Sequence, residues 1–151
     1  MAKYASKLYN EEVKFIDLKD YDLPFCDGDT CYENNTVKEL KQLVEESKSA
    51  IIASPIYMYD LNAVAKNFIE LTGRAWADKV VGFICAAGGK SSYMSATSFM
   101  NSLMLDFRCV VIPRFVYTDG SGFDNNNNIN EPIKDRIKEL VNQTVSISSS
   151  I

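Results

Sequence analysis

Histidine is the residue type that this sequence lacks, with none among its 151 residues. Its absence excludes histidine-based catalytic triads, HExxH metal sites and proton shuttles that use an imidazole ring. An enzyme with this sequence must use carboxylate, tyrosine, lysine or serine chemistry, or a cofactor that performs the reaction itself. Because the imidazole mechanisms are excluded, the absence of histidine favours a cofactor-dependent reaction.

Long apolar runs and clusters of basic residues are absent as well. The longest uninterrupted apolar stretch, VVGFICAA, covers only residues 80–87, whereas a membrane-spanning helix needs about 20. No basic and then apolar leader precedes the first periodic segment, so the sequence predicts a cytoplasmic protein with no membrane partner. With 16 basic and 20 acidic residues the net charge is -4, and a nucleic-acid backbone would be repelled rather than attracted.

The four cysteines predict neither disulfides nor a metal centre. A chain of this length can build a core without covalent links, and two of the cysteines lie in expected buried strands, so reduced thiols are expected. Cys26 and Cys31 have four residues between them. Neither a histidine nor a second suitable cysteine pair is present to complete a tetrahedral metal site with them.

Strand and helix patterns alternate along the chain. Short apolar runs bounded by proline, glycine or polar residues predict strands, and apolar residues at helical spacing behind a capping residue predict helices. The predicted strands are residues 13–18, 49–55, 79–87 and 109–116, and residues 1–9 already have helical character. The predicted helix starts are Thr36 with Glu39, Asp60, Ser91 or Ser92, and Asn130, and residues 146–151 are expected to form a frayed tail.

This alternation is typical of an open parallel α/β sheet with helices on both faces, and residues 1–151 are expected to form a single domain. Ligands of such sheets bind in the crevice beyond the carboxyl ends of the strands. Two segments lie there, PIYMYD after the strand at 49–55 and AAGGKSS after the strand at 79–87.

The two segments together could hold a flat heteroaromatic ligand. Tyr57, Met58 and Tyr59 could supply an apolar wall for its face, while backbone N–H groups of both segments meet its polar edge. Gly88 and Gly89 would allow close backbone approach. The alternative is that the aromatic residues cover the rim of the core and the glycines form a tight turn. The candidate binding residues are Pro55, Ile56, Tyr57, Met58, Tyr59, Asp60, Ala87, Gly88, Gly89, Lys90 and Ser91.

The longer segment SPIYMYDLNAVAKNFIELTGR resembles the signature of the NADPH-dependent FMN reductase family, which has a flavodoxin-like fold. Weaker similarities are DLPFCDGD after the first predicted strand, AAGG, and a late FD before the last helix, and together they cover most of residues 13–145. The signature positions are occupied here by Ser54, Pro55, Tyr57, Val64, Lys66 and Asn67.

The resemblance implies an oxidoreductase that uses FMN and NADPH or NADH to reduce a small-molecule acceptor such as a flavin, a quinone or an azo dye, in a homodimer or homotetramer. It implies that the flavin ring stacks on Pro55 to Asp60 and that its edge meets Ala87 to Ser91. Hydride then passes directly from nicotinamide to flavin N5, so no side chain need act as an acid or base.

The sequence departs from the family at its start. Family members open with an apolar strand and a Gly-Ser-x-Arg-x-x-Ser loop that holds the FMN phosphate, and these 151 residues contain neither. The expected sheet is therefore N-terminally truncated. Either about 25 to 35 residues of a longer protein are missing, or residues 13–18 pair directly beside residues 49–55. In the second case the loss of three charge-assisted hydrogen bonds would weaken FMN binding by about three orders of magnitude.

Two other functions stay open. A flavin-free binding module would keep the sheet and helices without the cofactor, and an electron-carrying flavodoxin is compatible with the acidic pI of about 4.9. Several further residues have both a functional and a structural interpretation: Lys90 as a phosphate contact, Arg74 and Trp76 at a partner's site or at a helix end, Tyr117 and Asp119 in the crevice, and Met94, Met100 and Met104 in the core or a subunit interface.

Overall fold

The computed structural model describes residues 1–9 and 13–151. Its centre is a five-stranded, mostly parallel sheet in the order β2-β1-β3-β4, with β5 also paired to β3. β1 and β3 run parallel in a register that pairs Ser49 with Val80 and Pro55 with Ala86. The strands are β1 Ser49–Tyr57, β2 Asp60–Leu61, β3 Val80–Ala86, β4 Val110–Val111 and β5 Val116–Thr118.

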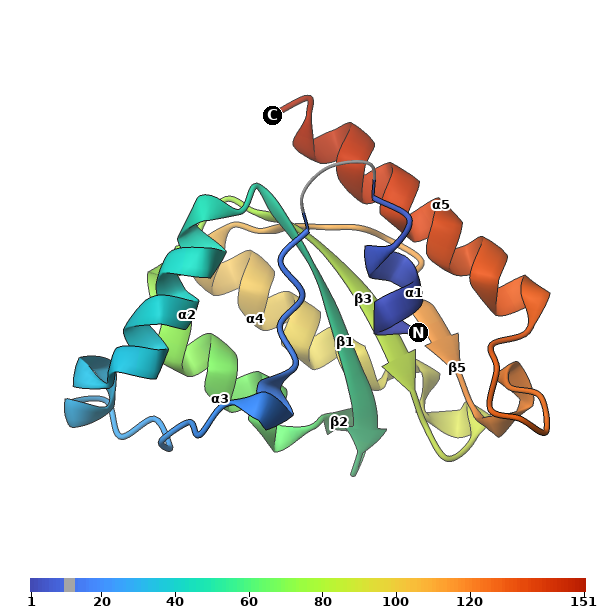
Figure 1. The fold of residues 1–151 in the computed structure, drawn as a ribbon, viewed down its shortest axis with the longest axis horizontal. Coiled ribbons are helices and arrows are strands. Elements are labelled where there is room, and N and C mark those ends of the chain that lie inside the picture. Colours follow the sequence, from blue (N-terminus) through green and yellow to red (C-terminus); the bar gives the residue numbers. More distant parts are fainter. Residues whose placement is uncertain (10–12) are drawn as a thin grey trace.

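Helices cover both faces of the sheet, as the sequence predicts (Figure 1). Alternate side chains of β3 point to opposite faces. Val81, Phe83 and Cys85 join the core with α2, α3 and α4, whereas Val80 and Ile84 join the core with α1 and α5. The helices are α1 Ala2–Ser6, α2 Asn35–Glu46, α3 Ala63–Thr72, α4 Thr97–Phe107 and α5 Glu131–Ser148.

Asparagine side chains cap three of the helices. Asn34, Asn62 and Asn130 each accept a hydrogen bond from the backbone N–H three residues later, which satisfies a donor that the helix leaves unpaired. The prediction for Asn130 is confirmed, but the predictions of Thr36 and Asp60 as caps are wrong, because a nearby asparagine takes each role. Ser91 and Ser92 do not cap α4 either, since a 3-10 segment, Lys90–Ala96, precedes that helix.

The predicted strand at 13–18 is wrong. Residues 13–17 have no regular secondary structure, and Leu18–Asp20 form a 3-10 turn capped by Asp17, whose side chain accepts the Lys19 N–H. Ile16 and Leu18 instead pack against the main core. Packing on the core therefore explains Ile16 and Leu18, whereas Val13 and Phe15 are exposed.

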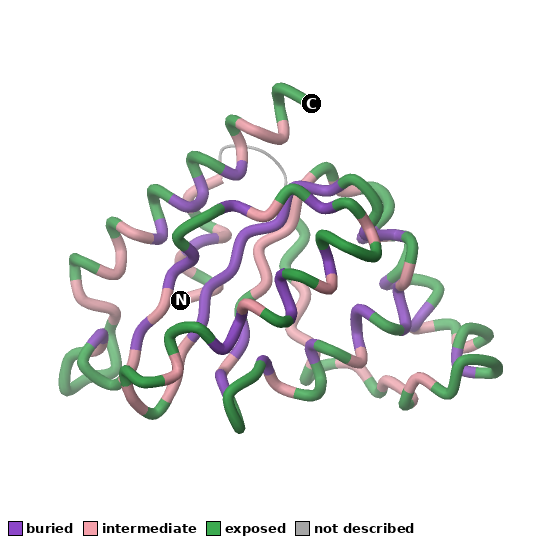
Figure 2. The backbone as a smooth tube through the Cα atoms, turned by 180° about the vertical axis from the view of Figure 1, so that it is seen from behind, coloured by how far each residue is buried: buried purple, intermediate pink, exposed green. Residues whose placement is uncertain are grey.

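β1 is less buried than β3. Within the described residues, only the two-residue β2 pairs with the edge of β1 opposite β3. Residues 49–52 are consequently half-buried, whereas Val80 to Cys85 of β3 are fully buried (Figure 2). The continuous apolar pattern of β3 is confirmed as a central strand covered on both faces.

The end of the chain differs from prediction at two points. The strand expected at 109–116 is interrupted between β4 and β5, where Pro113 lacks an N–H and Arg114 has a φ of 57°. The expected frayed tail is instead helical as far as Ser148, the end of α5. No helix among the described residues is both long enough and apolar enough to span a bilayer.

Candidate functional site

The candidate segments follow neighbouring strands at the carboxyl ends of those strands. Pro55 of β1 pairs with Ala86 of β3, and Figure 1 shows β1, β3 and β5 ending at the same side of the molecule. The segment after β1 therefore lies beside the glycine-containing segment after β3. A hydrogen bond between the hydroxyls of Tyr59 and Ser91, 3.4 Å long, joins the two segments directly.

The segment after β1 is a two-residue hairpin turn built from unusual residues. Tyr57 pairs with Asp60, and the two central residues, Met58 and Tyr59, have φ values of 50° and 63°. Two positive φ values are characteristic of the type I′ turn, where glycine is preferred because it lacks a Cβ and asparagine because it tolerates the left-handed region, whereas larger side chains are strained there. The sequence thus places two large side chains where backbone geometry alone favours small ones.

The large side chains of this hairpin point away from the core. The exposed fractions are 62% for Tyr57, 97% for Met58 and 66% for Tyr59, whereas the adjacent Ile56 and Leu61 are buried. The buried pair fixes the hairpin to the sheet, and the three exposed side chains form an apolar rim. Their exposure does not agree with the alternative in which the aromatic residues cover the rim of the core.

Asp60 holds this hairpin against α4. Its carboxylate accepts hydrogen bonds from the Leu61 N–H at 2.8 Å and from the Ser98 hydroxyl at 3.1 Å. Ser54, at the base of the hairpin, bonds both the side chain and the N–H of Asn62. Asp60 thus has a positioning contact that the sequence did not indicate.

The glycine-containing segment presents free donors at the same edge. The Ala87 N–H is already used, because it donates to the Thr118 carbonyl at 2.9 Å. Among the described residues, the N–H groups of Gly88 and Gly89 have no acceptor. A Cβ built on either glycine would meet no heavy atom within 4 Å, so both face open space.

Aromatic residues that the motifs did not single out support this segment. The Tyr93 ring stacks on Phe115 at 5.2 Å and meets Tyr117 edge-on at 5.5 Å. The Tyr117 hydroxyl donates a hydrogen bond to the Gly89 carbonyl, which fixes the orientation of that peptide. No sequence pattern identifies Tyr93, because its partners Phe115 and Tyr117 lie more than twenty residues away in the chain.

A cavity of about 190 Å³ lies next to the glycine-containing segment, at the carboxyl end of β5. Lys90, Tyr117 and Asp119 line this cavity together. The Asp119 carboxylate accepts the N–H and hydroxyl of Ser121, and these bonds, with a smaller contribution from Lys90, lower its pKa. Asp119 therefore stays ionised and organises this loop.

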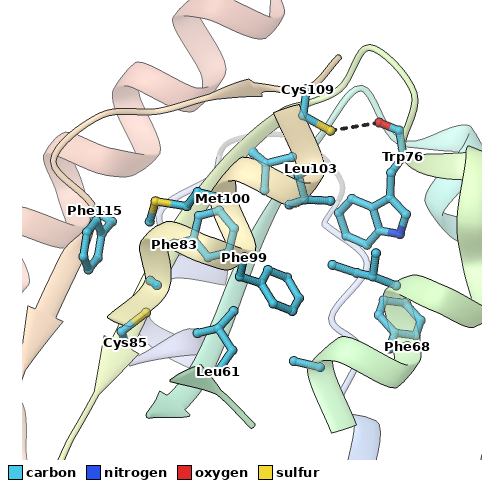
Figure 3. Close-up of a cluster of buried hydrophobic side chains, with 14 of the residues drawn as sticks. Leu61, Phe68, Trp76, Phe83, Cys85, Phe99, Met100, Leu103, Cys109 and Phe115 are labelled. Atoms are coloured by element: carbon cyan, nitrogen blue, oxygen red, sulfur yellow. Dashed lines mark hydrogen bonds between the residues drawn. The ribbon is translucent and has the colours of Figure 1, made fainter. Parts of the chain in front are cut away.

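Other candidates have structural roles. Trp76 is buried, donates its indole N–H to Thr72 and meets Phe68 edge-on at 6.1 Å, so it fixes the end of α3 (Figure 3). Met100 is in the buried cluster, but Met94 and Met104 are exposed, so the core interpretation holds only for Met100.

Asn67, a signature position, holds a distant loop onto α3. Its side chain accepts the N–H of Cys26 and donates to the carbonyl of Pro24, both at 2.9 Å. Asn67 thus has a structural role that the sequence alone did not reveal.

Comparisons with known proteins agree with this architecture. The NAD(P)H-dependent FAD/FMN reductase of Geobacillus thermodenitrificans is 28% identical over 144 residues, which cover 93% of this chain and 77% of that protein. The FMN reductase (NADPH) of Pseudomonas aeruginosa is 28% identical over 130 residues, covering 83% of this chain and 68% of that protein.

Solved structures share the fold. The flavoenzyme NAD(P)H:(acceptor) oxidoreductase of Paracoccus denitrificans superposes with a TM-score of 0.75 at 18% identity, over 98% of this chain and 87% of that one. The fold is thus flavodoxin-like, as predicted. The family model of the NADPH-dependent FMN reductases matches residues 1–124. Since that match spans most of the sequence, the chain belongs to the NADPH-dependent FMN reductase family.

Proposed function

We propose that this protein transfers electrons from NADPH or NADH through FMN to a small-molecule acceptor, and that FMN binds where β1 and β3 end. The observation that carries the proposal is the hairpin turn at Met58 and Tyr59. A strained backbone costs conformational free energy, and such strain is typically retained at functional sites. The exposed large side chains of this turn therefore indicate a function. A rim of this kind beside free backbone donors suits a flat ring with a polar edge.

The residues present fit the isoalloxazine ring. Tyr57 and Tyr59 offer exposed aromatic surface, and the open space beside Gly88 and Gly89 lets a ring edge approach their N–H groups. The hydrogen bond from Tyr117 turns the Gly89 carbonyl toward the protein. A ligand edge that carries oxygen and nitrogen acceptors would therefore meet donors rather than a competing acceptor.

When bound, FMN supplies the redox chemistry by accepting a hydride and passing the electrons on. The chain then has to orient the ring, shield one face from water and stabilise charge at its edge. Tyr57 and Tyr59 would cover a face, and the Gly88 and Gly89 N–H groups would stabilise negative charge as it develops. The rim holds no histidine, and the Asp60 carboxylate is held by Leu61 and Ser98.

The proposal also covers the electron acceptor, the oligomeric state and the cellular location. Flavins, quinones and azo compounds are flat molecules that could approach the exposed rim after the nicotinamide leaves. A homodimer or homotetramer in the cytoplasm is proposed on the resemblance to the family. Light scattering on the purified protein would measure the assembly, and a monomer at all concentrations would contradict that part.

A steady-state assay tests the function. Oxidation of NADPH and of NADH is followed with menadione as the acceptor, with and without added FMN. We expect FMN-dependent oxidation that falls when Tyr57 and Tyr59 are both replaced by alanine. Equal rates with and without FMN, or no oxidation above that of free FMN, would contradict the proposal.

A flavin-free binding module is the second candidate. It is favoured by one observation, the lack of the Gly-Ser-x-Arg-x-x-Ser motif in these 151 residues. Isothermal titration with FMN separates the two candidates. Heat of binding with one FMN per chain supports the oxidoreductase, whereas no binding at millimolar FMN would support the module.

A further inference from the structure

The loop between residues 19 and 34 carries two of the four cysteines and is closely ordered. The Asp27 carboxylate accepts the N–H groups of Asp29 and Cys31 and the hydroxyl of Thr30, at distances of 2.7 to 3.0 Å. Gly28, with a φ of 77°, allows the chain to turn there. The Cys26 N–H is fixed to Asn67 of α3. The backbone on both sides of the two cysteines is therefore held.

The two thiols share one small cluster. Cys31 is only 4% exposed and forms a buried cluster with Val37 and Leu71, and Cys26 packs against that cluster. Cys26 is itself partly exposed, and its sulfur lies 3.5 Å from the hydroxyl oxygen of Tyr32. An accessible thiol thus lies beside a buried one, five positions apart in the chain.

We propose that Cys26 and Cys31 form a dithiol that hydroperoxides oxidise to an intramolecular disulfide. Cys26 is the thiol that reacts first, because it can be reached from solvent and has a hydroxyl donor beside its sulfur. Cys31 is the resolving thiol, because it lies in the same cluster and is shielded from direct attack. The proposed flavin site does not include this pair.

The chemistry balances in two steps with hydrogen peroxide as the oxidant. The Cys26 thiolate attacks one peroxide oxygen, the O–O bond breaks, and Cys26 sulfenic acid and hydroxide form. The Cys31 sulfur then attacks the Cys26 sulfur, the S–O bond breaks, and water leaves with the Cys31 proton as the disulfide forms. Each dithiol loses two electrons and two protons, and each peroxide becomes two water molecules.

The surroundings of each thiol support this order. Burial, and then the hydrogen bond to Asp27, raise the pKa of the Cys31 thiol, which keeps it protonated until it is needed. The hydrogen bond with Cys26 raises the pKa of Tyr32 to about 12, so this phenol keeps its proton and can donate to a Cys26 thiolate. Hydrogen-bond donors stabilise a thiolate, the reactive form of cysteine.

The remaining cysteines provide an internal contrast. Cys85 is fully buried in β3, and burial raises its pKa to about 12. Cys109 is also buried, and its thiol donates to the Trp76 carbonyl. Since peroxide reacts with accessible thiolates, both should be inert. Metal binding by Cys26 and Cys31 is not favoured, because no group of three metal-ligating side chains occurs among the described residues.

Alkylation and peptide mapping test the proposal. The purified, reduced full chain, without NAD(P)H, is exposed to a small excess of hydrogen peroxide, alkylated, digested and analysed by mass spectrometry. We expect a disulfide-linked Cys26–Cys31 peptide that thioredoxin or dithiothreitol reduces, with Cys85 and Cys109 still fully alkylated. Cys31→Ser should instead accumulate a Cys26 sulfenic acid that dimedone captures, and Cys26→Ser should lose at least about tenfold in peroxide consumption rate.

Three results would overturn the proposal. One is oxidation of Cys85 or Cys109 as fast as that of Cys26. Another is a disulfide that links two chains rather than Cys26 to Cys31. The third is unchanged peroxide consumption by Cys26→Ser. The mapping of the unsubstituted protein decides the question even if a variant folds poorly.

Discussion

The backbone conformation of Met58 and Tyr59 bears most directly on why the segment SPIYMYD contains large side chains. Both have positive φ, in a turn for which asparagine and glycine are the favoured residues. A turn needed only to reverse the chain would use those smaller residues. The aromatic and sulfur side chains are exposed instead, and we attribute their presence to ligand contact.

The first prediction concerns the rim. Tyr57→Ala and Tyr59→Ala should each weaken FMN binding by about fivefold, because each removes a stacking surface worth about 1 kcal/mol. Quenching of flavin fluorescence would measure the dissociation constants. Phe25→Ala is the matched control, since Phe25 is an 88% exposed aromatic residue of another loop. Equal losses in all three variants would contradict the assignment.

The second prediction concerns Asp27. Hydrogen bonds from the Cys31 thiol, the Thr30 hydroxyl and backbone N–H groups hold the pKa of this carboxyl below its ordinary value of 3.8. Because the folded-state pKa is lowered, the stabilisation is fully present above the unfolded pKa and is lost as the pH falls below it. Asp27→Asn should thus be less stable than the unsubstituted protein at pH 7.

Urea unfolding at several pH values measures this effect. The difference in unfolding free energy between the two proteins should be constant from about pH 7 to pH 5 and shrink below about pH 4. A difference that stays the same or grows on acidification would show that the Asp27 charge is not what stabilises the loop.

Single residues also show where sequence reasoning was limited. Asp60 and Asn62 are both good capping residues and lie two positions apart, and only the packed hairpin decides that Asn62 caps α3 while Asp60 bonds Ser98. In the same way, Asn34 rather than Thr36 caps α2. Capping chemistry was predictable, but the choice between adjacent candidates depends on tertiary contacts.

Among the elements, β3 was the most predictable and residues 13–18 the least. A run of apolar residues with no polar alternation suits a strand covered on both faces, and β3 has that environment. The run at 13–18 also has four apolar residues, but of these only Ile16 and Leu18 pack on the core, and no ladder forms. Composition indicates burial in both cases, whereas strand formation also requires a neighbour in register.

The third prediction tests how the loop is attached to α3. Asn67→Ala removes both hydrogen bonds to the 24–26 backbone and should lower the unfolding free energy by about 1 to 3 kcal/mol. The urea midpoint measures this change. Asn101→Ala, at an exposed position of α4, should change it by less than about 0.5 kcal/mol. Similar effects from both variants would argue against the attachment.

The whole molecule was predicted correctly as a flavodoxin-like sheet with helices on both faces, because the alternation of strand and helix patterns extends over most of the chain. Contacts between residues far apart in the chain could not be predicted from the sequence. Tyr117 reaches Gly89, and Asn67 reaches Cys26, across 28 and 41 positions. These contacts depend on the sheet order, which local patterns do not encode.

The fourth prediction concerns the way the whole chain recognises its cofactor. The candidate residues are proposed to contact the flavin ring, and these 151 residues contain no Gly-Ser-x-Arg-x-x-Ser phosphate loop. FMN and riboflavin should therefore bind to this chain with dissociation constants within about threefold of each other. Calorimetric titration of both flavins measures the ratio. FMN binding more than about a hundredfold tighter would reveal a phosphate site elsewhere in the chain.

The most direct measurement of the central claim is an NMR titration of the nitrogen-15-labelled protein with FMN. The account predicts that the largest amide shifts fall on residues 57–60 and 87–91, with little change in α5. Shifts concentrated in α3 and α4 or around residues 130–133, with the hairpin and the glycine segment unchanged, would contradict it.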